Sequence, residues 1–231
     1  MNLKSNNFVT VVNMFSKYLK QLGFSFKYSE SQERYSKKTR TESRRTSGMS
    51  VQVFENVRQK QIALVLSDDR QLPLRFFAGF SLSNQGFIPV VEIVSGSGSK
   101  DYSNQIKELS KVSLTAFAQS VDKSLDLLDN LSNDMAAREC NIPELLDNMV
   151  NYRNSFSETS KLAQLVYTGT LNNSNGLCAL IVVCSALFQG KNVVKPRHYK
   201  GVFKKYSKFN GLTQLRYKFL ITDKLINEIL Q

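Results

Sequence analysis

The hydrophobic pattern of the chain changes its period at residues 95–100, a Ser/Gly linker with the sequence SGSGSK. Before the linker, over about 50–94, apolar residues alternate with other residues at a period of two, which is typical of strands. After it, over about 101–231, they recur every three or four positions, which is typical of helices. The pattern predicts an α+β fold, mostly helical, with a small antiparallel β-meander followed by a helical bundle.

The predicted meander contains three to five strands joined by short turns. Its apolar residues at alternate positions are Val51, Val53, Ile62, Leu64, Leu66, Leu72, Leu74 and Phe76, and a further β-rich run covers residues 87–94. Asp68 and Asp69 are predicted to form a turn. Proline cannot donate a backbone hydrogen bond, so Pro73 and Pro89 are expected at strand starts or on edge strands.

The first 28 residues are predicted to contain an amphipathic helix. Over residues 8–22 the apolar side chains are Phe8, Val11, Val12, Phe15, Leu19 and Leu22, and Gly23 is a plausible stop. Two interpretations remain open for this helix. It is either an ordinary packed helix or an exchange arm that docks on a neighbouring subunit.

Helical periodicity predicts several further helices after the linker. One begins near Tyr102 and either continues through Leu128 or breaks nearby, and another begins at Asn141 and Pro143. Further candidates are residues 159–171, a central buried helix over 177–188, and a last helix over 223–231 capped by Thr222.

Positive charge is concentrated in two segments. Of the 231 residues, 31 are Lys or Arg and 19 are Asp or Glu, which gives a net charge of +12. Residues 27–45 contain seven basic and three acidic residues, and residues 191–218 contain nine basic residues and no acidic one. The rest of the chain is nearly neutral. Such a distribution favours a polyanionic partner, most often nucleic acid and less often an anionic membrane surface.

The first basic segment is predicted to be a flexible arm over residues 29–49. Residues 29–48 contain one aromatic and no aliphatic residue, so little apolar burial offsets the entropy of ordering them. The arm is expected to contact phosphates through Lys37, Lys38, Arg40, Arg44 and Arg45.

The second basic segment is predicted to form a fixed basic patch in the helical domain. A helix over 197–209 would place Lys200, Lys204 and Lys208 in one stripe, flanked by Arg197 and Lys205. After a turn at residues 210–211, a short strand is expected to add Arg216 and Lys218. Whether the aromatic residues of 199–219 stack on bases or pack in the core stays open.

Few residues in the chain suit catalysis, and we expect no enzyme activity, metal or cofactor. His198 is the only histidine, which excludes metal sites built on paired histidines. Three cysteines fit a disulfide framework poorly, and Cys178 and Cys184 are expected to be small buried apolar residues. The remaining enzymatic alternative is a metal-dependent nuclease that uses Asp68 and Asp69.

The chain is expected to be intracellular, with no transmembrane segment. The N-terminal residues lack the continuous apolar run of a secretory signal. The longest apolar run, over 177–188, is too short to span a bilayer, which needs about 20 residues.

The layout resembles that of viral coat and nucleocapsid proteins of RNA viruses, which combine a basic flexible arm, a compact core and terminal elements that dock on neighbours. The resemblance implies a non-enzymatic, sequence-tolerant RNA-binding protein that forms homo-oligomers through its terminal helices on nucleic acid. Single-stranded RNA is the favoured partner. It implies a location in the virion or the host cytoplasm. The alternative is an accessory protein of the viral movement or silencing-suppressor type.

Overall fold

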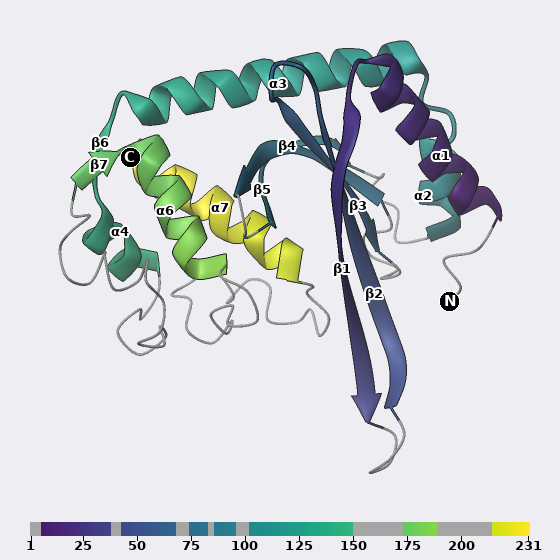
Figure 1. Cartoon of the computed structure of the whole chain (residues 1–231), viewed down its shortest axis with the longest axis horizontal. Helices are drawn as coiled ribbons and strands as arrows, with labels where there is room; N and C mark the ends of the chain where they lie inside the picture. Colours follow the sequence, from purple (N-terminus) through teal and green to yellow (C-terminus); the bar gives the residue numbers. More distant parts are fainter. Residues whose placement is uncertain are drawn as a thin grey trace. The chain divides into compact units, whose positions relative to one another are not determined.

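A computed structural model describes residues 6–37, 43–67, 74–82, 86–95, 102–149, 173–188 and 214–231 (Figure 1). The fold is α+β, with an N-terminal helix, a five-stranded antiparallel meander and then helices, as the sequence predicts. The meander has the order β1 (Ser25–Lys37), β2 (Ser43–Glu55), β3 (Gln61–Ser67), β4 (Leu74–Leu82) and β5 (Gly86–Ser95). Pro89 lies in β5, which is an edge strand, as expected.

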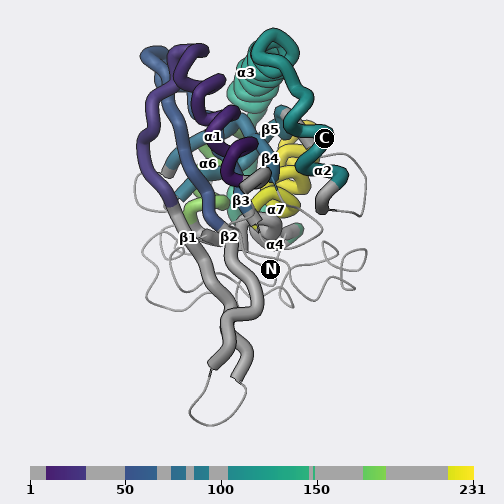
Figure 2. The backbone as a smooth tube through the Cα atoms, turned by 90° about the vertical axis from the view of Figure 1, so that its right-hand side faces the viewer, coloured from purple at the N-terminus to yellow at the C-terminus, as the bar shows by residue number. Residues whose placement is uncertain are grey.

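The helices are α1 (Asn6–Gln21), α2 (Tyr102–Leu109), α3 (Leu114–Ala136), α4 (Ile142–Met149), α6 (Gly176–Phe188) and α7 (Gln214–Leu230). The long helix predicted after the linker is therefore broken, between α2 and α3, and α3 continues without interruption for 23 residues (Figures 1 and 2). Two short strands, β6 (Glu139–Asn141) and β7 (Asn173–Asn175), pair with each other in a second sheet. The helix predicted over 159–171 lies outside the described residues.

The chain divides into two compact units. The first contains Met1–Phe80 and Val91–Leu127, and the second contains Ser81–Val90 and Leu128–Gln231. The division passes through β4, β5 and α3 rather than through the predicted linker at 95–100.

The predicted N-terminal helix and its stop are confirmed. Gly23 has a φ of 81°, and its N–H donates to the carbonyl of Lys20 at 3.1 Å. The N–H of Phe24 donates to the carbonyl of Leu19 at 2.9 Å. These two bonds form the Schellman motif that ends many helices, and the left-handed backbone at its centre favours glycine.

The core of the first unit contains a cluster of three aromatic rings from α1, β4 and α3. Phe15, Phe76 and Phe117 are each fully buried, and their ring centroids lie 4.6–5.1 Å apart. Tyr18 adds a hydrogen bond from its hydroxyl to the carbonyl of Val112 at 3.2 Å. The apolar face of α1 is thus packed within its own chain, which agrees with the packed-helix interpretation. A role of α1 in subunit exchange stays a prediction.

The sheet begins earlier than predicted. The meander was expected from about residue 50, with a flexible arm over 29–49, but residues 29–37 belong to β1 and residues 43–49 to β2. The prediction that the sheet starts only near residue 50, after a separate arm, is therefore wrong for these residues. It relied on the shortage of apolar residues, whereas neighbouring strands are joined by backbone hydrogen bonds that any residue except proline can make. Residues 38–42 lie outside the described part of the chain.

The second unit has its core between α6, α7 and α4. Val183 and Cys184 of α6 and Leu225 and Ile229 of α7 are buried, as is Ile142 of α4. The predicted start of α4 is confirmed, because the side-chain oxygen of its N-cap residue Asn141 accepts from the N–H of Glu144 at 3.2 Å.

The expected burial of the two cysteines in α6 is confirmed for Cys184 and wrong for Cys178, which is exposed. The buried residues of α6 follow one side of the helix, at Ala179, Leu180, Val183 and Cys184. Cys178 lies about 200° around the helix from Leu180 and therefore faces away from this side. The apolar run thus does not make α6 a helix buried on every side.

The predicted strand over 214–219 and the predicted cap at Thr222 are wrong. Both segments belong to the single helix α7, inside which the Thr222 hydroxyl donates to the carbonyl of Lys218 at 2.7 Å. Lys218, Ile221, Thr222, Leu225, Ile226 and Ile229 are all buried. Their spacing of three and four residues gives α7 one buried side, which begins before the helix predicted over 223–231.

Candidate nucleic-acid interface

The pairing of β1 with β2 continues well beyond the end of β3. The last β2–β3 pair is Met49 with Ser67, whereas β1 and β2 remain paired to Lys37 and Ser43 (Figure 1). Within the described part of the chain, no third strand joins the segments 33–37 and 43–48. We call these two segments the ribbon.

The last four backbone pairs of the ribbon carry four basic residues. These pairs are Arg34 with Ser47, Tyr35 with Arg45, Ser36 with Arg44, and Lys37 with Ser43. None of the eight residues is acidic. At about 3.3 Å per residue, the four cations are distributed over about 10 Å of strand. Strand pairing thus groups Lys37, Arg44 and Arg45 of the predicted set and adds Arg34.

Most of the other predicted contact residues lie outside the described part of the chain. These are Lys38, Arg40, Arg197, Lys200, Lys204, Lys205 and Lys208, together with His198 and the possible metal ligands Asp68 and Asp69. Arg216 and Lys218 are in α7 rather than in a strand. The side chain of Lys218 is buried, so we do not include it in the interface.

At the other end of β1 and β2, an ion pair joins the two strands. Lys27 Nζ lies 2.5 Å from Glu55 Oε2, and Gln61 Nε2 donates to the same oxygen at 2.6 Å. The hydrogen bond from Lys27, followed by the one from Gln61, holds the pKa of Glu55 below its usual value. Glu55 is therefore ionised and neutralised by Lys27 at neutral pH.

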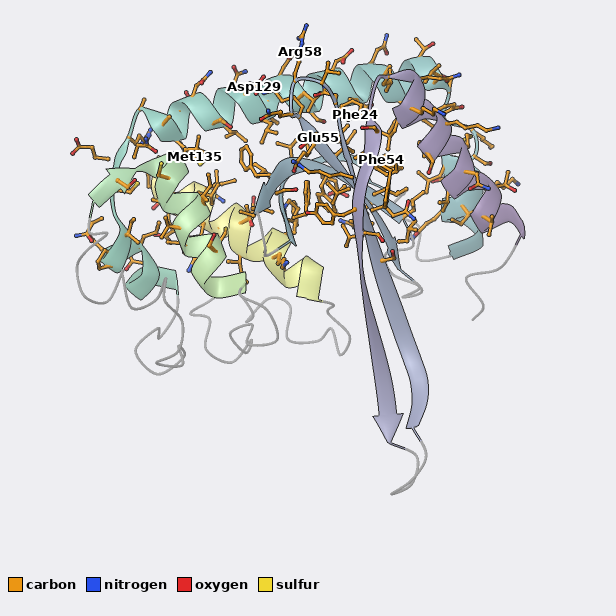
Figure 3. All side chains as sticks on the ribbon, in the orientation of Figure 1. Phe24, Phe54, Glu55, Arg58, Asp129 and Met135 are labelled. Carbon is orange, nitrogen blue, oxygen red and sulfur yellow. The ribbon has the colours of Figure 1, made fainter. Side chains whose placement is uncertain are left out.

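The loop between β2 and β3 is held by one asparagine. Asn56 Oδ1 accepts from the backbone N–H of Arg58 at 3.0 Å and from that of Lys60 at 2.9 Å. Gln59 has a left-handed backbone, with a φ of 60°. Val57, 98% exposed, and Arg58, also exposed, lie at the tip, and Figure 3 shows Arg58 pointing away from the strands. The bonds to Asn56 give this small loop a defined shape.

Next to this loop, β1 presents an exposed aromatic ring. Phe26 is 58% exposed, and it pairs in register with Phe54 of β2. The two rings make an edge contact, with centroids 5.9 Å apart and planes at 80°. Phe54 is buried, so it fixes one side of Phe26 while more than half of that residue's surface faces solvent.

One further ion pair lies on the sheet, between β4 and β5. Arg75 Nη1 lies 3.1 Å from Glu92 Oε1, and both side chains are between a quarter and a third exposed. Burial raises the pKa of Glu92, and the nearby Arg75 guanidinium opposes this shift. A single half-buried pair of this kind is a common structural feature, and we assign it no chemistry.

Over the residues that the structure describes, no three His, Cys, Asp or Glu side chains form a group that could hold a metal ion. In the same part of the chain, no helix combines the length and the apolar character needed to cross a membrane.

Sequence reasoning missed three residues of this region: Arg34, Phe26 and Arg58. Arg34 belongs to the basic segment 27–45 but stands apart from the adjacent basic residues at 37–38 and 44–45. Phe24, Phe26 and Tyr28 alternate with polar residues at a period of two. That alternation is the signal that could have predicted the start of β1.

The comparisons with known proteins give no relative: no protein-family model matches the chain, and neither a curated protein nor a solved structure is significantly similar to it.

Proposed function

We propose that this protein is a non-enzymatic, sequence-tolerant RNA-binding protein that assembles on its nucleic acid, in the manner of a viral coat or nucleocapsid protein. The observation that carries the proposal is the ribbon. Its last four backbone pairs, interrupted by one register shift between Arg34 and Tyr35, hold four basic residues and no acidic one.

The ribbon's charges are unfavourable for folding in the absence of a partner. A two-stranded ribbon is marginally stable by itself in water. Four cations within four backbone pairs also repel one another, although no basic residue is paired directly with another basic residue. A polyanion reverses this effect, because each neutralised phosphate releases condensed counterions. The cost of grouping these cations is therefore offset when nucleic acid is bound.

The nature of the charged groups supports sequence tolerance. Lys and Arg contacts to phosphates fix the position of a nucleic acid but carry no sequence information. The second basic segment, at residues 191–218, supports assembly, because a protein with two separate cationic segments can contact two stretches of one strand or two different strands.

A binding experiment with the full chain tests the proposal. The protein is purified without nuclease, and the co-purifying nucleic acid is analysed. Protein from which this nucleic acid has been removed is then titrated into labelled single-stranded RNAs of different sequence. Light scattering measures particle size, and a gel shows whether the RNA stays intact. We expect salt-sensitive binding with similar affinity for each sequence, growth of large particles and intact RNA. Absence of binding would overturn the proposal.

Two other results would favour the alternatives. Small complexes that never grow with added RNA would indicate an accessory protein of the movement or silencing-suppressor type. RNA cleavage that requires Mg²⁺ and is lost in Asp68→Asn would indicate a nuclease.

A further inference from the structure

We propose that Phe26 is a stacking platform for a base of single-stranded RNA, a role that rests on the proposed function and assigns a contact residue outside the ribbon. The platform lies at the end of the sheet opposite the ribbon, beside the loop of residues 56–60.

The first argument is the geometry of the ring. Phe26 touches Phe54 edge to face, and it remains 58% exposed. Phe54 is buried and keeps Phe26 in place, so the exposed ring loses little conformational freedom when a base stacks on it. Stacking of bases on aromatic side chains is the usual way in which proteins bind single strands without sequence preference.

The second argument is the charge around the ring. Lys27 follows Phe26 in β1, and Arg58 lies at the tip of the neighbouring loop. Glu55 is the only acidic residue in the described segments 24–29 and 54–61, and it is paired with Lys27 and Gln61. With Arg58 and Lys60 included, this end of the sheet is net positive, which suits the phosphates on either side of a stacked base.

The third argument is the position of the platform on the strand that leads into the ribbon. Arg34 lies eight residues beyond Phe26 in β1, about 26 Å away along an extended strand. This distance is long enough for a short stretch of single strand to contact the platform at one end and the ribbon at the other. An aromatic platform combined with a positively charged track is the typical design of single-strand binding surfaces.

The chain contains no tryptophan, which permits a direct test. Phe26→Trp introduces a single indole at the proposed platform and keeps an aromatic surface. We expect this variant to bind single-stranded RNA as tightly as the original chain, with quenching of its fluorescence as the RNA saturates. Duplex RNA of the same sequence should quench it little, because paired bases are not available for stacking.

Removal of the ring gives the complementary measurement. Phe26→Ala and Phe26→Leu should both weaken binding of single-stranded RNA by about 5- to 150-fold, because neither keeps an aromatic face. The slope of affinity against salt should not change, since no cation is removed. Phe26→Leu is the matched control, as it preserves an apolar side chain of similar length.

Several outcomes would overturn the proposal. Unquenched Trp fluorescence at saturating RNA, or full affinity in Phe26→Ala or Phe26→Leu, would show that no base stacks on the ring. A change in sedimentation of Phe26→Ala with unchanged RNA affinity would instead make Phe26 a contact between copies of the chain. If the unmodified chain binds RNA and these variants bind it equally well, only the platform fails. If the unmodified chain binds no RNA, the proposed function fails as well.

Discussion

Gly176, the first residue of α6, lies directly against Ile229 of α7. A Cβ atom at position 176 would come within 2.5 Å of Ile229 Cγ2 and within 2.7 Å of the Met135 carbonyl oxygen. The N–H of Gly176 also donates to the carbonyl of Arg138 at 2.8 Å, which fixes the backbone there. We therefore predict that Gly176→Ala lowers the free energy of unfolding by about 1–3 kcal/mol, measured by urea denaturation.

Gly23 provides a control, because substitution there is disfavoured by the backbone conformation and not by a lack of space. It has space around it, with no atom within 4 Å of an added Cβ, but its φ of 81° disfavours side chains. Gly23→Ala should lower the free energy of unfolding by about 1–2 kcal/mol, and Gly23→Asn by less, because asparagine tolerates this backbone. At position 176 asparagine should be no better than alanine. Equal behaviour of asparagine at the two sites would contradict this interpretation.

The aromatic cluster of the first unit predicts a large effect of a core substitution. Phe15 is fully buried against Phe76 and Phe117, so Phe15→Ala should lower the free energy of unfolding by about 3–5 kcal/mol. Val9→Ala, at an exposed position of the same helix, should change it by less than about 0.5 kcal/mol. A small effect of Phe15→Ala would show that α1 does not pack in its own chain.

The pKa values of two glutamates are shifted in opposite directions from the usual value. Hydrogen bonds from Lys27 and Gln61 lower the pKa of Glu55, whereas burial raises that of Glu92. The stabilisation from Glu55 is therefore present above pH 4.5 and is lost as the pH falls through its lowered pKa. Protonation of Glu92 instead stabilises the fold as the pH falls from its raised pKa toward 4.5.

Carboxyl NMR titration of the folded protein measures both values, and we expect Glu55 to titrate at lower pH than Glu92. Glu55→Gln should reduce the loss of stability in acid. Glu92→Gln should remove the gain in stability that occurs as the pH falls toward 4.5. The reverse order of the two pKa values would contradict the described contacts.

The three cysteines should differ in their reactivity with a thiol reagent near pH 8. Cys178 is exposed and should react first. Burial raises the pKa of Cys140, against the effect of Arg138, and raises the pKa of Cys184 to about 12. Because the thiolate is the reactive form, Cys140 should react slowly and Cys184 only after unfolding. Loss of the fast phase in Cys178→Ser checks the assignment, and rapid reaction of Cys184 would contradict its burial.

The sequence predicted those elements in which periodicity and capping residues agree. The meander core, the end of α1 at Gly23 and the start of α4 at Asn141 are examples. The ribbon was missed because backbone hydrogen bonds hold its strands together, and these leave no apolar pattern in the sequence. The start of α7 was predicted as a strand because Leu215, Tyr217 and Phe219 alternate at period two. The buried side of the helix is instead formed by residues at helical spacing, beginning with Lys218, Ile221 and Thr222.

Sequence reasoning was more limited for the candidate interface. It identified Lys37, Arg44 and Arg45 as cations, but strand register, which depends on pairing at a distance, decides that they lie within four backbone pairs of one another. The exposure of Phe26 depends on its edge strand and on its contact with Phe54, and neither can be derived from composition.

The central claim is that the ribbon binds the RNA backbone. The salt dependence of RNA affinity in two matched variants tests it most directly. One replaces Arg34, Lys37, Arg44 and Arg45 by Gln. The control replaces the four exposed residues Lys17, Lys20, Lys107 and Lys111 by Gln, which removes the same charge from α1, α2 and the turn that follows α2. The slope of log affinity against log salt for single-stranded RNA is negative. We predict that its magnitude decreases by about three in the ribbon variant and by much less in the control. Equal slopes in the two variants would contradict the claim.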